Sequence, residues 1–167
     1  NTVAVRDNAL AAIVAYTSAT GQAALTTSTY SDATVTGVSG LNVDAVNSLI
    51  AALPATAKDT AAEVQAVVNA YNKVAALADG TAGGVGSLTA IEFAALGLGI
   101  IDTPVEVSIM NAYLDVSAGS AVDSAAELSA LETAVSKLAA TASVTLPAAT
   151  PTPGPTLADL AALGING

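Results

Sequence analysis

Apolar residues recur at helical spacing in two long stretches of the chain, which begin after Thr60 and after Ser124. In each stretch, four large apolar side chains are separated by three or four positions, so they lie on one face of a helix. These side chains are Val64, Val67, Tyr71 and Val74 in the first stretch and Leu128, Leu131, Val135 and Leu138 in the second. The pattern predicts two amphipathic helices of similar design.

Both helices begin with the residues of a capping box. In this motif a Ser or Thr side chain accepts from the third helical amide, and an acid three positions on accepts from the Ser or Thr amide. The predicted boxes are Thr60 with Glu63, Ser124 with Glu127, Thr89 with Glu92, Thr103 with Glu106, and Thr156 with Asp159. Two further helix starts are weaker, because Thr26 is followed by Thr29 instead of an acid and Ser39 by Asn42. The boxes predict short helices that alternate with longer ones.

The same order of motifs occurs more than once. The run Asp59–Val64 returns 64 positions later as Asp123–Leu128, and Phe93–Leu98 returns 67 positions later as Leu160–Ile165. A fixed period of this length is typical of an array of small helical units. We therefore predict an all-α chain of tandem three-helix units with a Pro-rich extended linker near the C-terminus. The predicted segments are the end of a preceding unit (1–20), two units (21–80 and 81–143), the linker (144–155) and the start of a further unit (156–167).

Composition narrows the classes of function. The chain has no Cys and no His, so it lacks the usual ligands of zinc, haem and iron–sulfur clusters and the usual nucleophile and base pairs. Its net charge is -10, with 14 acids and 4 bases, which argues against nucleic acid as a partner. No run of about 18 apolar residues is present, so no membrane span is predicted. We expect neither catalysis nor a cofactor.

Two acid pairs are the strongest candidates for a metal site. Asp59 with Glu63 and Asp123 with Glu127 stand four positions apart at a helix start. No calcium-binding loop surrounds either pair, and acids at these positions cap a helix and complement its dipole. We interpret them as caps and predict no metal site.

Other repeated polar residues favour structural roles. Asn47 and Asn111 lie at the border of an apolar stripe, where a buried amide is expected to bond to a neighbouring loop. Lys73 and Lys137 fall late in their helices, where a cation complements the negative helix end. The glycine-rich loop Gly83–Gly86 lacks the lysine and the preceding strand of a phosphate-binding loop.

The motifs also resemble a known kind of repeat. An Ala-Leu-Gly-Ile-type short helix, the helix Asn42–Ile50 and the helix Asp59–Val68 resemble tandem repeats of about 60 residues in very large secreted bacterial surface proteins. The resemblance covers essentially the whole chain, although the first unit has Ala33–Thr36 in place of the Ala-Leu-Gly-Ile run. It implies an exported array that forms stalks, fibres or matrix, and it transfers no ligand-binding residue.

These observations predict a structural module at the cell surface or outside the cell. Only 11% of the residues are charged, whereas an ordinary soluble surface is about a quarter to a third charged, so close approach of neighbouring helices is expected. The two end segments carry apolar faces that we expect to contact other copies or neighbouring repeats. The candidate contact residues are Leu10, Ile13, Val14, Leu157, Leu160 and Leu163.

Two other functions stay open. A module that binds a host or surface glycan would need an exposed aromatic platform, and the chain has only Phe93 and four tyrosines. An ice- or mineral-binding surface would need a regular threonine array, and Thr26, Thr27 and Thr29 are irregularly spaced. Both are therefore weaker predictions than assembly.

Overall fold

The computed structural model describes residues 2–84, 86–142 and 156–163. This part of the chain has eight α-helices, two short 3-10 helices and no β-strand. The α-helices are α1 (Val3–Ala15), α2 (Thr27–Asp32), α3 (Val43–Ala52), α4 (Ala61–Leu77), α5 (Ala90–Ala95), α6 (Pro104–Val116), α7 (Ala125–Ala142) and α8 (Leu157–Ala162). The 3-10 helices are η1 (Ala55–Ala57) and η2 (Gly119–Ala121). The all-α prediction is confirmed for these residues, whereas the Pro-rich segment 144–155 lies outside them.

The predicted capping boxes are present at the starts of α4, α5, α6, α7 and α8. The weaker start at Thr26 also forms a box, because the Thr29 hydroxyl accepts from the Thr26 amide in place of a carboxylate. Helix α3 is the exception. Its N-cap Asn42 makes no side-chain cap bond and instead accepts from the Ser39 amide at 2.7 Å. The helix therefore begins at Val43 and not near Ser39.

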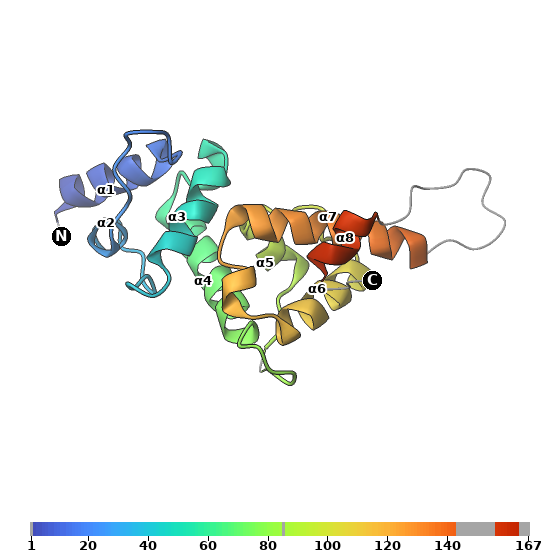
Figure 1. Ribbon diagram of the computed structural model, residues 1–167. Coiled ribbons are helices and arrows are strands. Elements are labelled where there is room, and N and C mark those ends of the chain that lie inside the picture. The colour runs from blue at the N-terminus through green and yellow to red at the C-terminus, as the bar shows by residue number, and fades with distance from the viewer. Residues whose placement is uncertain (1, 85, 143–155, 164–167) are drawn as a thin grey trace.

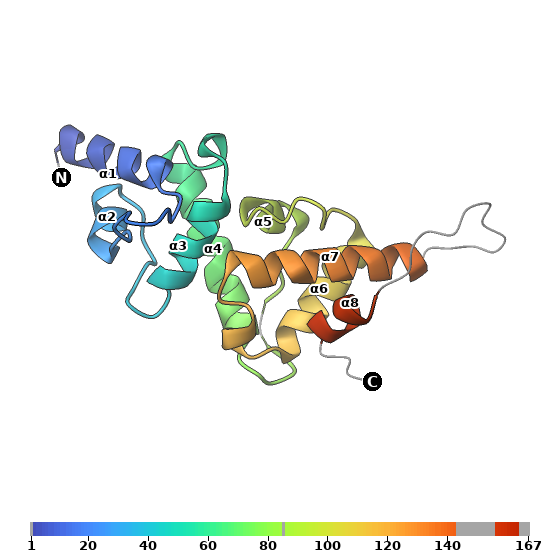
Figure 2. The ribbon, with the colours of Figure 1, turned by 45° about the horizontal axis from the view of Figure 1, so that its top comes forward.

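The helices are arranged along an elongated body (Figures 1 and 2). Helices α1 and α2 pack together at one end, α7 and α8 pack together at the other, and α4 lies between and contacts α3, α5 and α6. Helix α7 reaches back to α3, so the two halves are in contact. Helix α8, in the segment predicted to start a further unit, packs directly against α7. No helix of the described chain is long and apolar enough to cross a membrane.

A single hydrophobic core runs through the helices from α1 to α7. The apolar stripes predicted for α4 and α7 face this core, and only Leu138 among their residues is half-exposed. The largest fully buried aromatic side chains are Tyr30 in α2 and Phe93 in α5. The six-residue helices α2 and α5 therefore each contribute one aromatic anchor to the core, which helps to hold these short helices in position.

Candidate functional site

The two acid pairs are engaged in helix capping. Glu63 accepts from the Thr60 amide at 2.9 Å, and Glu127 accepts from the Ser124 amide at 3.0 Å. Hydrogen bonds from the Thr60 side chain and amide lower the pKa of Glu63, while a hydrogen bond to Glu63 raises the pKa of Asp59. The capping interpretation is confirmed for Glu63 and Glu127. Within the described residues, no three Asp, Glu, His or Cys side chains come together in a way that could hold a metal ion.

Lys73 and Lys137 do not sit at helix ends, so the prediction that they complement the helix dipole is wrong. Neither α4 nor α7 has a basic residue in its last turn. Lys73 pairs with Glu92, and Lys137 contacts both carboxylate oxygens of Asp159 at 2.8 and 2.9 Å. These acids are the capping-box acids of α5 and α8, so each lysine joins a long helix to the start of the next short helix.

The ion pairs change the acidity of both capping acids. The contact with Lys73, followed by the Thr89 amide, lowers the pKa of Glu92. The contact with Lys137, together with hydrogen bonds from Thr156, lowers the pKa of Asp159 from 3.8 to about 2. Each acid therefore caps its own helix and also forms an ion pair with the preceding long helix.

The contact between α1 and α2 has the same order of helices but no ion pair. Ala9 occupies the position 64 residues before Lys73, and Thr29 occupies the acid position of the box. Because the base and the acid are replaced together, neither charge is left without its partner. This paired difference indicates that the lysine and the acid work as one contact.

Asn47 and Asn111 bond to the segment before the short helix, as predicted. The Asn47 amide donates to the Leu25 carbonyl at 2.8 Å, and the Asn111 amide donates to the Leu88 carbonyl at 2.8 Å. The side-chain oxygens find different donors. Asn47 accepts from the Tyr30 hydroxyl at 2.7 Å, whereas Asn111 accepts from the Leu88 amide at 2.8 Å.

Two buried charged residues were not predicted. Lys58 is 1% exposed and donates to the carbonyls of Tyr16 at 2.7 Å and Ile50 at 2.6 Å, near the C-terminal ends of α1 and α3. Burial lowers the pKa of this amine, and the two helix ends offer it partial negative charge. The repeat could have predicted this burial, because the residue 64 positions after Lys58 is the apolar Val122, which is also buried.

Glu132 in α7 is the second buried charge. It accepts from the Ile100 amide at 2.8 Å and so fixes the loop between α5 and α6. Burial raises the pKa of this carboxyl, the Ile100 amide opposes that shift, and the charge of Glu106 adds to it. Its counterpart 64 positions earlier is the buried Val68, again a core position.

The glycine-rich loop binds a carboxylate of the chain itself. The amides of Gly83 and Gly84 donate to Asp115 at 2.9 and 2.6 Å. A Cβ atom at Gly84 would lie 2.8 Å from an Asp115 oxygen, so the close approach requires glycine there. The loop amides are thus used to hold the end of α6.

The predicted assembly residues have different surroundings. Ile13 is fully buried in the core, whereas Leu10 and Val14 are half-buried and line an open groove on α1. Leu160 and Leu163 are also half-buried, and Leu163 packs against the core. The side chain of Leu157 lies outside the described part of the structure.

Aromatic side chains do not form an exposed platform. Phe93 and three of the tyrosines are buried, and Tyr113 is half-buried. The threonines Thr26 and Thr29 are engaged in the capping box of α2.

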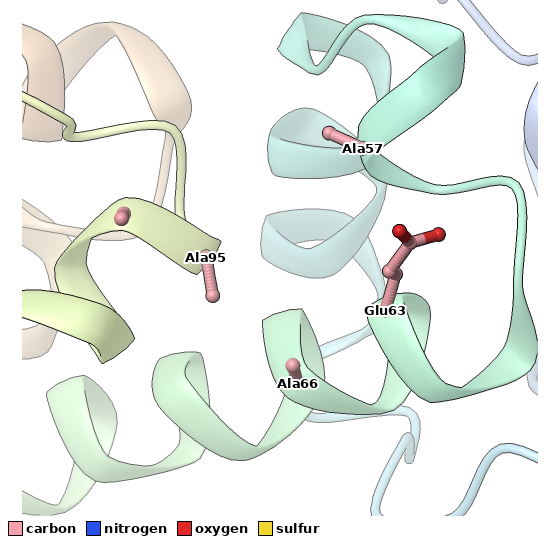
Figure 3. Close-up of a pocket in the computed structure, with 5 residues that line it drawn as sticks. Ala57, Glu63, Ala66 and Ala95 are labelled. Carbon is pink, nitrogen blue, oxygen red and sulfur yellow. The ribbon is translucent and has the colours of Figure 1, made fainter.

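A shallow hollow of about 220 Å³ lies between α4 and α5. Ala57 from η1, Ala66 from α4 and Ala95 from α5 face it, with Glu63 at the start of α4 (Figure 3). A second hollow between α3 and α7 is lined only by alanine and serine residues. The two hollows are lined by methyl groups and hydroxyls, together with the Glu63 carboxylate.

Comparison with models of protein families, with characterised proteins and with solved structures finds no match to this chain.

Proposed function

We propose that this chain is a structural module of an extracellular bacterial surface protein, built from tandem three-helix units at 21–80 and 81–143. In this proposal it associates with further copies or neighbouring repeats into a filament, layer or matrix. It has no catalytic role and requires no cofactor.

The observation that carries the proposal is a recurring contact between successive helices. A long helix packs on the next short helix three times, as α1 on α2, α4 on α5 and α7 on α8. An asparagine of the following helix binds the segment before the short helix in two of these places, at Leu25 and Leu88. A lysine and a capping acid form an ion pair in two of them. A contact that repeats in the same form is how a linear array of units is built.

The surface chemistry supports association with similar surfaces. Alanine side chains lose no rotamer entropy when they are covered, and they line the hollows beside α3, α4 and α5.

The charges of the chain act in the opposite direction. All four bases already have partners within the chain: Arg6 pairs with Asp7, Lys58 is buried, and Lys73 and Lys137 pair with capping acids. The net charge of -10 then opposes association at low ionic strength.

Location outside the cell is supported by the sequence alone. The chain has no Cys, few Lys and many Thr and Ala residues, a composition typical of exported bacterial surface repeats. The resemblance to such repeats gives the same expectation.

Sedimentation velocity at increasing salt concentration tests the proposal. We expect monomers at low ionic strength and growing, polydisperse species as salt screens the repulsion between acidic surfaces. A chain that sediments as a monomer at every salt and protein concentration would contradict the assembly role.

A further inference from the structure

Helix α8 is held on the surface of α7 (Figures 1 and 2). Lys137 Nζ lies 2.9 and 2.8 Å from the two carboxylate oxygens of Asp159, and the Asp159 side chain is only 9% exposed. Leu163, which directly follows α8, packs against the hydrophobic core. The surface of α7 around Lys137, which we call the α7 site, therefore binds a short helix through an ion pair and an apolar contact.

The other two short helices receive further contacts from the helix that follows them. Asn47 of α3 bonds to Tyr30 of α2 and to the Leu25 carbonyl before it. Asn111 of α6 bonds to the amide and the carbonyl of Leu88, before α5. Within the described residues no helix follows α8. Release of α8 therefore breaks fewer contacts than release of α2 or α5.

The ion pair makes the contact between a long and a short helix selective. The lysines of α4 and α7 pair with the capping acids Glu92 and Asp159. Helix α1 has Ala9 at the equivalent position and packs on α2, whose capping box has Thr29 in place of the acid. An exchange of partners between these two kinds of contact would leave a lysine or an acid without its counter-charge. A long helix with a lysine therefore favours a short helix with a capping acid.

The connection between α7 and α8 has enough residues to reach a second molecule. The thirteen residues 143–155 lie between the described parts of the two helices in the sequence. A chain of this length spans at most about 45 Å when fully extended. The α7 site of a second copy offers α8 the same contacts, which is the condition for exchange of an element between identical chains.

We propose that the α7 site recognises a short helix whose capping box contains an acid, and that α8 of a second copy occupies this site during assembly. Reciprocal exchange closes a dimer, whereas donation of α8 from each copy to the next builds an open chain. This inference rests on the proposed function, because it names the contact through which copies associate.

Two full-length variants that cannot form the contact by themselves test the proposal. The donor, Lys137→Asp, keeps α8 intact and repels Asp159 from its own α7 site. The acceptor, Asp159→Lys with Leu163→Asp, keeps the α7 site intact and disables its own α8. We expect unlabelled donor at millimolar concentration to shift the amide signals of isotope-labelled acceptor in α7 around Lys137, as measured by nuclear magnetic resonance. Unlabelled acceptor should produce no such shifts, and circular dichroism checks that each variant is folded.

A second donor, Lys137→Asp with Asp159→Thr, separates recognition of the acid from general helix contact. Thr at this position can complete the capping box as Thr29 does in α2, so the start of the helix is preserved while the charge is removed. We expect this donor to bind the acceptor about tenfold more weakly than the first donor, because the charged hydrogen bonds to Lys137 are lost. Equal binding of the two donors, or no shift with the first donor, would overturn the proposal.

Sedimentation of the wild-type chain separates the failure of this inference from the failure of the proposed function. If donor and acceptor do not associate while the wild-type chain still forms large species at high salt, α8 is not the connecting element and the assembly function stands. If the donor binds the acceptor while the wild-type chain stays monomeric at every concentration, the recognition site is supported and the assembly function is wrong.

Discussion

Two side-chain amides at equivalent positions, Asn47 buried and Asn111 half-buried, have different hydrogen-bond partners. The Asn47 oxygen accepts from the Tyr30 hydroxyl, while the Asn111 oxygen accepts from the Leu88 amide. Phe93 has the same position in α5 as Tyr30 in α2 and carries no hydroxyl. Both side chains bind the backbone before a short helix, so the structural role is kept although the donor changes. Periodicity predicted these asparagines because they border an apolar stripe.

The first prediction concerns this exchange of donors. Tyr30→Phe should lower the free energy of unfolding by less than about 1 kcal/mol, because the Asn47 oxygen can turn to the Leu25 amide as Asn111 does at Leu88. Asn47→Ala should cost about 2–4 kcal/mol, because it leaves the Leu25 carbonyl and the Tyr30 hydroxyl buried without a partner. Urea denaturation of both variants measures the difference. Equal losses would show that the two asparagines are not interchangeable in this way.

The burial and the hydrogen-bond partners of Lys58 and Glu132 could not be predicted from the sequence pattern. Each is a charged residue at a position whose counterpart is a buried valine, Val122 or Val68. Their partners are backbone groups far along the chain, Tyr16 for Lys58 and Ile100 for Glu132. Hydrophobic patterning cannot identify such partners, because it depends only on neighbours in sequence.

At the scale of elements, helix starts were predictable and helix contacts were not. A capping box is local, so Thr60 and Glu63 specify it within four residues. The role of Lys137 is not local, because its partner Asp159 lies 22 residues away on another helix. The glycine-rich loop shows the same difference. Its local sequence excludes a phosphate-binding loop, whereas its contact with Asp115, about 30 residues away, could not be predicted.

The second prediction concerns the attachment of α8. The pKa of Asp159 is lowered in the folded chain from 3.8 to about 2, so the ion pair with Lys137 stabilises the docked helix above pH 3.8. This stabilisation is lost as the pH falls through about 2. Amide signals of α8 should therefore change between these values, ahead of the signals of α4.

Two variants serve as controls for that experiment. Lys137→Met should release α8 already at neutral pH, whereas Lys73→Met, which removes the equivalent pair at α5, should leave the titration of α8 unchanged. Detachment of α8 in the wild-type chain with a midpoint above pH 5, or the same titration curve in Lys137→Met, would contradict this account.

At the scale of the whole molecule, the fold class followed from the repeated stripes and caps. The order of a short helix, a second helix, a 3-10 turn and a long helix occurs twice, as α2–α4 and as α5–α7. The binding partners of the surface could not be predicted from the hydrophobic pattern, because the shape of the surface is formed by helices that are distant in sequence. The groove on α1 is an example, because Asp7 and Asp59 are 52 positions apart in sequence and line the same groove only in the folded chain.

The central claim is that the chain assembles with similar chains or repeats. Electron microscopy of the purified chain, at high protein concentration and a salt concentration that screens its charge of -10, tests it most directly. The account predicts fibres or sheets with a regular repeat. A field of dispersed, compact single particles under the same conditions would contradict it.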